Sequence, residues 1–504
     1  MRIGLMVPAL SPHDAVGNDV LGMYIALRKQ GYDCTIFTAN GETSYPIPVL
    51  RYDDAPLFIS SPEDIIVYHY CFSEEFAVRI LRNVRGRIVL KYHNLTPSQF
   101  MAPYSWEYAA SCKRGRDTLR AVCDLPLAGV INDSDYNARD IAQVLPPGVP
   151  MSTVAPMHRI SELLGCADDQ EMRATLDHSW FNIVAVGRVV PNKALDLMIP
   201  ALAKLRDDGV AGVRLHIVGG RDPRLQSYIS MVEGLIADSG LGDAVTWHHS
   251  VSATKLATLY RHADLFWTTS QHEGFCVPVV EAMAFGLPVL SSRQGALPET
   301  CGDAAVLADR TEEMARQLRR LTTDDALRAE LSEKGLRRYR DEFRMARLEP
   351  KFIAALEAIA RTTDVQRPAA DADWFGLPHT DALIGFATAM CADTPYGRLA
   401  TSDGRRQFLD WLIRVGRRDA AEVAALLRSA DFASYARDLE VPEPASHLSP
   451  PMRLAWHFDL AARSAFQLRT NPDVAAFLEW YAASAAADYG DLFSAPVRAA
   501  AAAH

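Results

Sequence analysis

Short apolar runs alternate with amphipathic stretches over about the first 360 residues of the chain. We interpret five apolar runs as buried strands of a first unit, at residues 3–7, 33–38, 64–69, 87–93 and 127–132. Amphipathic stretches between them, such as 18–30 and 105–122, favour helices. This alternation is typical of βαβ units, in which helices cover both faces of a parallel sheet.

The alternation stops at a turn-rich segment and then starts again. Residues 145–156 are rich in proline and favour a joint between domains. Five later runs predict a second parallel sheet, at 181–187, 213–220, 243–248, 264–269 and 287–292. Helices are expected between them, at 194–207, 224–238 and 252–262. Two such units are expected to hold a ligand in the cleft between the carboxyl edges of their sheets.

The pattern predicts three domains. Two Rossmann-like domains with parallel sheets are expected at 1–155 and 156–361, and a helical extension at 362–504. The extension is rich in alanine and arginine and shows no strand alternation. The short motif Phe-Leu-acid-Trp occurs twice in it, ending at Trp411 and Trp480, which fits either a weak repeat or two amphipathic helices of a small bundle.

Composition excludes several classes of protein. The 504 residues include 52 basic and 62 acidic side chains, and this net charge of −10 argues against a nucleic-acid-coating protein. The basic stretch from Lys113 to Arg120 is interpreted as a solvated helix face. The eight cysteines form no C-x2-C pair and indicate reduced thiols in a cytoplasmic protein. No apolar run is long enough for a spanning helix, although peripheral contact with a membrane stays open.

Residues 270–292 carry the clearest chemical signal. Pro278 suits the first turn of a helix, so the N–H groups of Gly274, Phe275 and Cys276 are expected to point out of the helix start. Such N–H groups, together with the helix dipole, bind anions such as phosphate. Gly274 would also let the backbone approach a ligand closely.

Two carboxylates flank this predicted anion site. Glu273 precedes the helix and Glu281 lies about one turn inside it. Carboxylates repel phosphate but accept hydrogen bonds from hydroxyl groups, so the pattern predicts a nucleotide sugar, with Glu281 on the ribose and Glu273 on the transferred sugar. The alternative is a carboxylate that complements the helix dipole next to an exposed glutamate.

Cations are needed to offset a diphosphate, and two follow the first strand of the second unit. Arg188 directly follows that strand, and Lys193 lies at the opening of the next helix. Fixed cations there stabilise the negative charge that a leaving diphosphate gains. The alternative is that both are surface residues that pair with Asp196.

The first domain offers weaker candidates. Gly17 opens the helix after the first strand and is a candidate for contact with a phosphate or an acceptor, and His93 ends a buried strand at the predicted cleft. The stretch Asp133–Asp135 has the D-x-D form of metal-dependent transferases. We interpret Ser134 as a helix N-cap and predict no metal, because the phosphate site already has its own cations.

Residues 1 to about 360 resemble the retaining glycosyltransferases of family four, which have the GT-B fold. The resemblance rests on GRVVPNK, HIVGG, the segment from ADLFWTT to GLPVLSS and GALPETCGDAAVL, in that order. It implies that Arg188, Lys193 and the backbone of residues 274–276 bind the donor phosphates. It also implies that Glu273 contacts the donor sugar, that Glu281 binds the ribose, and that His93 lies near the reacting sugar.

Two positions depart from the family pattern. Asn18 stands where many relatives have a second glycine, and His249 stands where a glycine is common beside the base pocket. The resemblance implies an N-terminal acceptor-side domain and a C-terminal domain that binds the nucleotide sugar. Residues 362–504 fall outside it.

The sequence thus predicts an α/β GT-B enzyme that moves a hexosyl group, with retention, from a nucleotide-diphosphate-sugar to a glycan or lipid-linked glycan, in surface polysaccharide biosynthesis. No cofactor, metal or nucleic acid is expected. The alternatives are a silent nucleotide-sugar-binding scaffold and a phosphorylase or epimerase of the same fold. The C-terminal helices leave dimerisation, docking of a partner and contact with a membrane open.

Overall fold

The computed structural model describes residues 1–361, apart from 12–13, 44, 46, 60 and 178. The helical extension predicted at 362–504, with Trp411 and Trp480 and the roles considered for it, lies outside the described residues.

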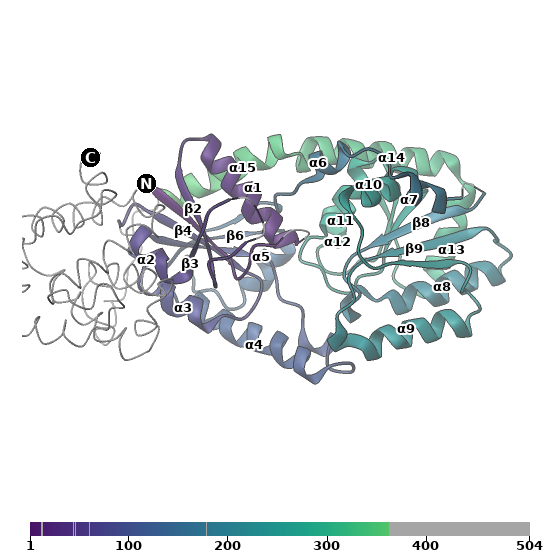
Figure 1. Cartoon of the computed structure of the whole chain (residues 1–504), viewed down its shortest axis with the longest axis horizontal. Coiled ribbons are helices and arrows are strands. Elements are labelled where there is room, and N and C mark those ends of the chain that lie inside the picture. Colours follow the sequence, from purple (N-terminus) through teal and green to yellow (C-terminus); the bar gives the residue numbers. More distant parts are fainter. Residues whose placement is uncertain (12–13, 44, 46, 60, 178, 362–504) are drawn as a thin grey trace, which may run out of the picture.

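The first domain is built on a seven-stranded parallel sheet in the order β3-β2-β1-β4-β5-β6-β7 (Figure 1). Its strands are β1 (Arg2–Met6), β2 (Asp33–Thr38), β3 (Val49–Arg51), β4 (Ile65–Tyr70), β5 (Arg87–Tyr92), β6 (Leu127–Asn132) and β7 (Met151–Thr153). Its helices are α1 (Ala15–Lys29), α2 (Ala55–Phe58), α3 (Glu75–Leu81), α4 (Trp106–Cys123) and α5 (Asp135–Ile141).

Helices cover both faces of this sheet because successive strand residues point to opposite sides. Ile65 and Val67 of β4 pack in the core that includes α1. Ile66 and Tyr68 pack in the core formed with α3 and α4. Strands buried on both faces are therefore almost continuously apolar, as the sequence indicated.

The second domain has a six-stranded parallel sheet in the order β10-β9-β8-β11-β12-β13. Its strands are β8 (Phe181–Val186), β9 (Val213–Val218), β10 (Val245–His248), β11 (Leu265–Thr268), β12 (Val289–Ser291) and β13 (Ala305–Leu307). The helices after β7 are α6 (Ile160–Leu164), α7 (Gln170–Thr175), α8 (Leu195–Asp207), α9 (Gln226–Asp238), α10 (Ala253–His262), α11 (Val277–Ala284), α12 (Leu297–Cys301), α13 (Thr311–Thr323), α14 (Asp325–Arg338) and α15 (Met345–Ala360). Apolar residues of α8, α9 and α13 fill one core, and those of α10 and α11 fill the other.

The two parallel sheets with helices on both faces confirm the predicted fold class. All ten predicted strands overlap observed ones, whereas β3, β7 and β13 were missed. Each of these three strands has three residues and lies at the edge of its sheet. All three are at most partly buried, and three residues give too short a pattern to indicate a strand.

The helix α15 crosses from the second domain back to the first (Figure 1). The domain boundaries predicted from the sequence assign α15 to the second domain, at 156–361. In the structure, Phe352, Leu356 and Ile359 of this helix pack in the same core as β1, β2 and β4 of the first domain. A Cβ added to Gly129 of β6 would lie 2.7 Å from Cδ1 of Ile359, so the helix packs directly on the strand. Among the described residues, no helix has the length and apolar character to span a membrane.

Candidate active site

The loop between β11 and α11 ends in a left-handed residue at the helix start. Cys276 immediately precedes α11, and its φ of 81° is rare for a residue other than glycine. Pro278 lies in the first turn, as predicted. Within the described part of the chain, the N–H groups of Gly274, Phe275 and Cys276 donate to no protein acceptor. They are therefore free to bind an anion at the positive end of the helix dipole.

Gly274 is in contact with the first domain rather than with open space. A Cβ at this position would lie 2.8 Å from the carbonyl oxygen of His93 and 2.9 Å from Cβ of Asn94. The carbonyl of Gly274 also accepts a hydrogen bond of 2.7 Å from Ser134 Oγ. The carboxyl ends of β5 and β6 thus meet the loop after β11, and a glycine is required for this close approach.

Lys193 and Glu273 form an ion pair between Nζ and Oε1, with side chains 21% and 11% exposed. Burial alone would lower the pKa of Lys193, but the Glu273 carboxylate raises it above its ordinary value, so the ammonium stays charged. The alternative partner, Asp196, instead accepts a hydrogen bond of 2.9 Å from the Tyr228 hydroxyl. Lys193 follows β8 and Glu273 follows β11, and these two strands are neighbours in the sheet.

Arg188 and Glu281 each contact a tyrosine hydroxyl. Arg188 is exposed at the end of β8, and its Nη1 donates to the Tyr108 hydroxyl of α4 across the domains, at 3.2 Å. Glu281 accepts a hydrogen bond of 2.7 Å from the Tyr260 hydroxyl. Burial raises the pKa of Glu281 above its ordinary value, although the Tyr260 bond opposes the shift. The carboxylate is therefore oriented by α10 and is not a freely solvated surface group.

Gly17 has a local role in the first helix. Asp14 is the N-cap of α1, and its Oδ2 accepts a hydrogen bond of 3.0 Å from the N–H of Gly17. A Cβ on Gly17 would lie 2.8 Å from the carbonyl oxygen of Ser11. The N-cap and the preceding loop account for a glycine here, and contact with a phosphate or acceptor stays a prediction.

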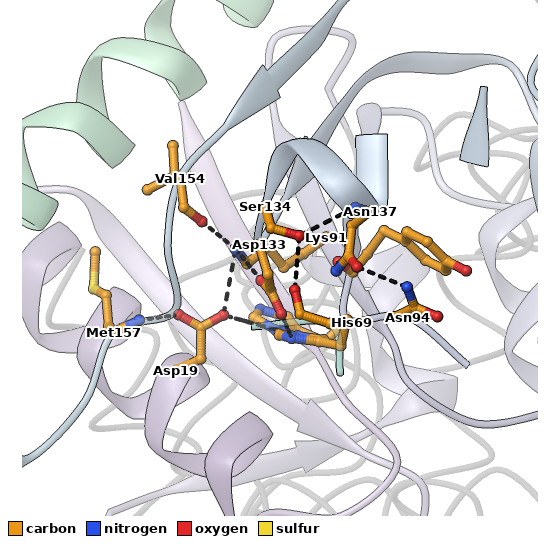
Figure 2. Close-up of polar contacts among 12 residues, drawn as sticks. Asp19, His69, Lys91, Asn94, Asp133, Ser134, Asn137, Val154 and Met157 are labelled. Carbon is orange, nitrogen blue, oxygen red and sulfur yellow. Dashed lines mark hydrogen bonds and ion pairs between the residues drawn. The ribbon is translucent and has the colours of Figure 1, made fainter. Parts of the chain in front are cut away.

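A buried polar network in the first domain, in which Figure 2 labels Asp19, His69, Lys91 and Asp133, includes His93. Its Nδ1 lies 2.9 Å from Oδ2 of Asp133, and its Nε2 lies 3.0 Å from Nδ1 of His69. Lys91 Nζ lies 2.6 Å from Oδ1 of Asp133, and Asp19 Oδ1 accepts from the N–H of Met157 at 2.7 Å. The imidazole is 5% exposed and points into the domain, while the backbone carbonyl of His93 faces Gly274.

Three members of this network were missed in the sequence. Asp19 lies on the buried side of α1, and His69 and Lys91 lie inside the strands β4 and β5. A lysine and a histidine inside otherwise apolar strands were the available signal, because a charge inside a sheet requires a buried partner.

The stretch Asp133–Asp135 does not gather its side chains around one point. Asp133 joins the network above, and Ser134 caps α5 by accepting from the N–H of Asn137, as expected. Asp135 accepts from the Thr153 hydroxyl at 2.7 Å.

Asp19, His69 and His93 offer three ligand atoms within 4.8 Å of one another, which is close enough for a metal ion. The two rings, however, lie end to end, with centres 5.2 Å apart and planes 21° apart. The distance between the ring centres is close to the distance between His69 Nδ1 and His93 Nε2 plus the radii of the two rings, as expected for rings that face each other through these nitrogens. Nδ1 of His69 and Nε2 of His93 therefore point at each other and not at a third atom, which favours a hydrogen bond between them over coordination of a metal ion.

The second domain also contributes a charged contact to the first domain. On α12, Glu299 accepts from the N–H groups of Asp135 and Tyr136 at 2.6 and 3.0 Å. This carboxylate therefore caps the first turn of α5, which belongs to the first domain.

Comparisons with known proteins find related sequences and related folds. Residues 171–338 match the family described as glycosyl transferases group 1. An MMP alpha-(1->4)-mannosyltransferase of Mycolicibacterium hassiacum is 33% identical over 187 residues, which are 36% of this chain and 44% of that protein. A D-inositol 3-phosphate glycosyltransferase of Mycolicibacterium smegmatis is 32% identical over 171 residues, 33% of this chain and 36% of that protein. The chain spans less than half the length of these two curated relatives.

Solved structures share the whole two-domain arrangement. A sucrose-phosphate synthase of Thermosynechococcus elongatus has a TM-score of 0.58 at 18% identity, covering 72% of this chain and 100% of that one. Anabaena HepE, solved in complex with UDP and glucose, has a TM-score of 0.56 at 15% identity, covering 71% of this chain and 100% of that one. At this identity the likeness concerns the fold, and the fold is GT-B.

Proposed function

We propose that the protein transfers a sugar from a nucleotide-diphosphate-sugar donor to an acceptor hydroxyl. The observation that carries the proposal is the Lys193–Glu273 ion pair beside the free N–H groups at the start of α11. An anion site and a sugar-binding carboxylate at one edge of the sheet would account for this arrangement. The match to glycosyl transferases group 1 and the UDP and glucose of the structural neighbour support the assignment.

The ion pair suggests how a donor would bind. A diphosphate carries more charge than one carboxylate and would compete for Lys193. Glu273 would then be free to accept hydrogen bonds from hydroxyl groups of the donor sugar. Glu281, already held by Tyr260, would accept from the ribose hydroxyls. The exchange of partners would place the sugar between the carboxylate and the phosphates.

The leaving diphosphate gains negative charge as the glycosidic bond breaks. Lys193, Arg188 and the N–H groups of residues 274–276 are fixed in place before the reaction, so they would stabilise this charge without further rearrangement. His93, at the facing edge of the first domain, is proposed to lie near the reacting sugar. In this proposal the cations and N–H groups neutralise the diphosphate, and no metal or cofactor takes part.

The finer assignment follows the family resemblance. We propose a hexosyl transfer with retention of the anomeric configuration and a glycan or lipid-linked glycan as acceptor, in surface polysaccharide biosynthesis at the cytoplasmic face of a membrane. The names of the curated relatives, a mannosyltransferase and an inositol-phosphate glycosyltransferase, are compatible with either a glycan or a polyol phosphate acceptor.

The test is a panel of GDP-, UDP- and ADP-sugars, read first by thermal shift and then by transfer of labelled sugar. The true donor is expected to raise the melting temperature, because binding to the folded state stabilises it. Transfer should fall at least a hundredfold in Glu273→Gln and Lys193→Ala, and stay unchanged in the control Lys204→Ala, which alters an exposed lysine of α8. Unchanged transfer in the two site variants would refute the assignment, and tight donor binding without any transfer would favour a silent scaffold.

A further inference from the structure

A segment of the first domain packs on the loop that carries both cations of the anion site. We call residues 100–112 the bridging segment, which comprises the end of the loop after β5 and the start of α4. Met101 of this segment shares a small apolar cluster with Val190 and Leu225 of the second domain, and all three residues are at most 2% exposed. Val190 lies between Arg188 and Lys193 in the chain, so the bridging segment contacts the loop from which both cations project.

Two further contacts hold the bridging segment on α9, beside which it lies in Figure 1. The ring of Tyr104 packs edge-on against the ring of Tyr228, with centres 5.0 Å apart and planes 70° apart. The carbonyl of Tyr104 accepts a hydrogen bond of 3.0 Å from Ser227 Oγ. The position of Tyr108, four residues further along the chain, is therefore set by packing between the domains and does not depend on Arg188 alone.

Tyr108 contacts two arginines of the second domain. Its hydroxyl accepts a hydrogen bond of 3.2 Å from Arg188 Nη1, and the guanidinium carbon of Arg224 lies 4.4 Å from the centre of its ring. Arg224 is fixed in turn by Asp222, with Nε 3.0 Å from Oδ1 and Nη2 2.6 Å from Oδ2. A guanidinium stacked on the ring stabilises the ring in one orientation, which directs the hydroxyl toward Arg188.

Arg188 keeps most of its hydrogen-bond donors. A guanidinium has five N–H groups, and within the described residues only the one that donates to Tyr108 has a partner. Asp222 is close enough that Arg224 and, to a smaller extent, Arg188 lower its pKa below the ordinary value, but both of its carboxylate oxygens already accept from Arg224. The remaining N–H groups of Arg188 can therefore bind phosphate oxygens in a fork.

We propose that Tyr108 is a positioning residue that orients Arg188 toward the donor phosphates, so that the first domain completes the phosphate site of the second. The inference rests on the proposed function, in which Arg188 binds the diphosphate. An exposed arginine loses side-chain freedom when it binds a ligand. A hydroxyl on a packed segment restricts the guanidinium before the ligand arrives, so less freedom is lost on binding. Tyr108 acts through Arg188 and does not have to touch the donor.

The test is the affinity of the full chain for inorganic pyrophosphate, GDP, UDP and ADP, measured by calorimetry. Tyr108→Phe removes the hydroxyl and keeps the ring that Arg224 stacks on. We expect it to raise the Kd of the diphosphates by about three- to tenfold, because a hydrogen bond to a charged group is lost. The melting temperature without ligand should stay unchanged. The matched control is Tyr104→Phe, on the same segment, whose hydroxyl makes no hydrogen bond within the described residues, and its Kd should equal that of the wild type.

A double-mutant cycle distinguishes this role from simple packing between the domains. Arg188→Met is expected to raise the Kd by about tenfold or more. Adding Tyr108→Phe to Arg188→Met should then have no further effect, because the hydroxyl acts only through the guanidinium. Losses that add in the double variant would overturn the proposal, as would wild-type affinity in Tyr108→Phe.

Arg188→Lys is a second variant, which leaves the bridging segment intact and serves if Tyr108→Phe does not fold. It keeps the charge but lacks the fork that one hydroxyl and a phosphate can share, so most of the affinity should be lost, and wild-type affinity would overturn the proposal. Lys193→Met separates this inference from the proposed function. Weak binding in Lys193→Met and Arg188→Met with normal binding in Tyr108→Phe would refute the inference alone. Absence of binding of all four diphosphates to the wild type would refute the proposed function, and this inference with it.

Discussion

At the scale of single residues, Lys193 is the cation on which the anion site most depends. It is paired with Glu273 and largely buried, so replacing it leaves a carboxylate without its partner. Lys193→Met is expected to weaken donor binding and to reduce transfer by about a hundredfold, which corresponds to roughly 3 kcal/mol of transition-state stabilisation. Single-turnover kinetics would separate the two effects. A loss confined to thermal stability, with kcat and donor affinity intact, would show that the pair is only structural.

Gly274 is the residue at which a single methyl group would be most disruptive. Its Cβ would meet the carbonyl of His93 at 2.8 Å, and a backbone atom cannot move aside easily. Gly274→Ala is expected to lower the melting temperature and to reduce donor binding, because the two domains would be forced apart at the site. Gly234→Ala is the matched control. That glycine lies inside α9 with nothing within 4 Å of an added Cβ, and alanine there should stabilise the helix by about 0.5–1 kcal/mol.

At the scale of secondary-structure elements, the first turn of α5 is capped from both domains. Ser134 Oγ accepts a hydrogen bond from the N–H of Asn137 in the same helix and donates one to the carbonyl of Gly274. From the second domain, the Glu299 carboxylate accepts hydrogen bonds from the N–H groups of Asp135 and Tyr136. Glu299→Ala is expected to destabilise the contact between the domains by about 1–2 kcal/mol, since the first turn of α5 would lose a charged acceptor for two N–H groups. Hydrogen exchange at residues 135 and 136 is the direct measurement. Glu312→Ala, in the first turn of α13, serves as the control.

The β8–β9–β10 edge of the second sheet carries a pH-dependent element. Burial lowers the pKa of His216 to about 4, with His248 and Arg214 as further causes. Because the folded pKa lies below the unfolded one, its contribution to stability is complete above about pH 6.5 and is lost as the pH falls toward 4, up to about 3 kcal/mol. Urea unfolding at pH 7 and pH 4.5 should therefore show a smaller pH effect in His216→Asn than in the wild type. Equal pH effects would mean that His216 is protonated without penalty.

At the scale of the whole molecule, the inner strands and the donor loop were predictable and the first-domain network was not. Inner strands such as β6 and β8 consist mainly of apolar residues, so the sequence pattern indicates where they lie. The three-residue edge strands β3, β7 and β13 are too short to give such a signal. Glu273 and Lys193 were recognised separately, but their ion pair depends on two strands that are neighbours in the sheet and distant in the chain. Asp19, His69 and Lys91 come from three elements, and only the topology brings them together.

The helix α15 makes the stability of the first domain depend on residues that follow the second. Phe352 is fully buried in the core that contains β1, β2 and β4. Phe352→Ala is expected to cost about 3–5 kcal/mol and to lower the melting temperature of the first domain. The donor should still bind the second domain, because the anion site lies outside this core. Calorimetry with and without donor would separate the domains, with Lys351→Ala on the exposed side of the same helix as control. If Phe352→Ala instead unfolded the second domain first, α15 would be part of that domain's core, and the packing of its apolar face on the first sheet would not determine stability.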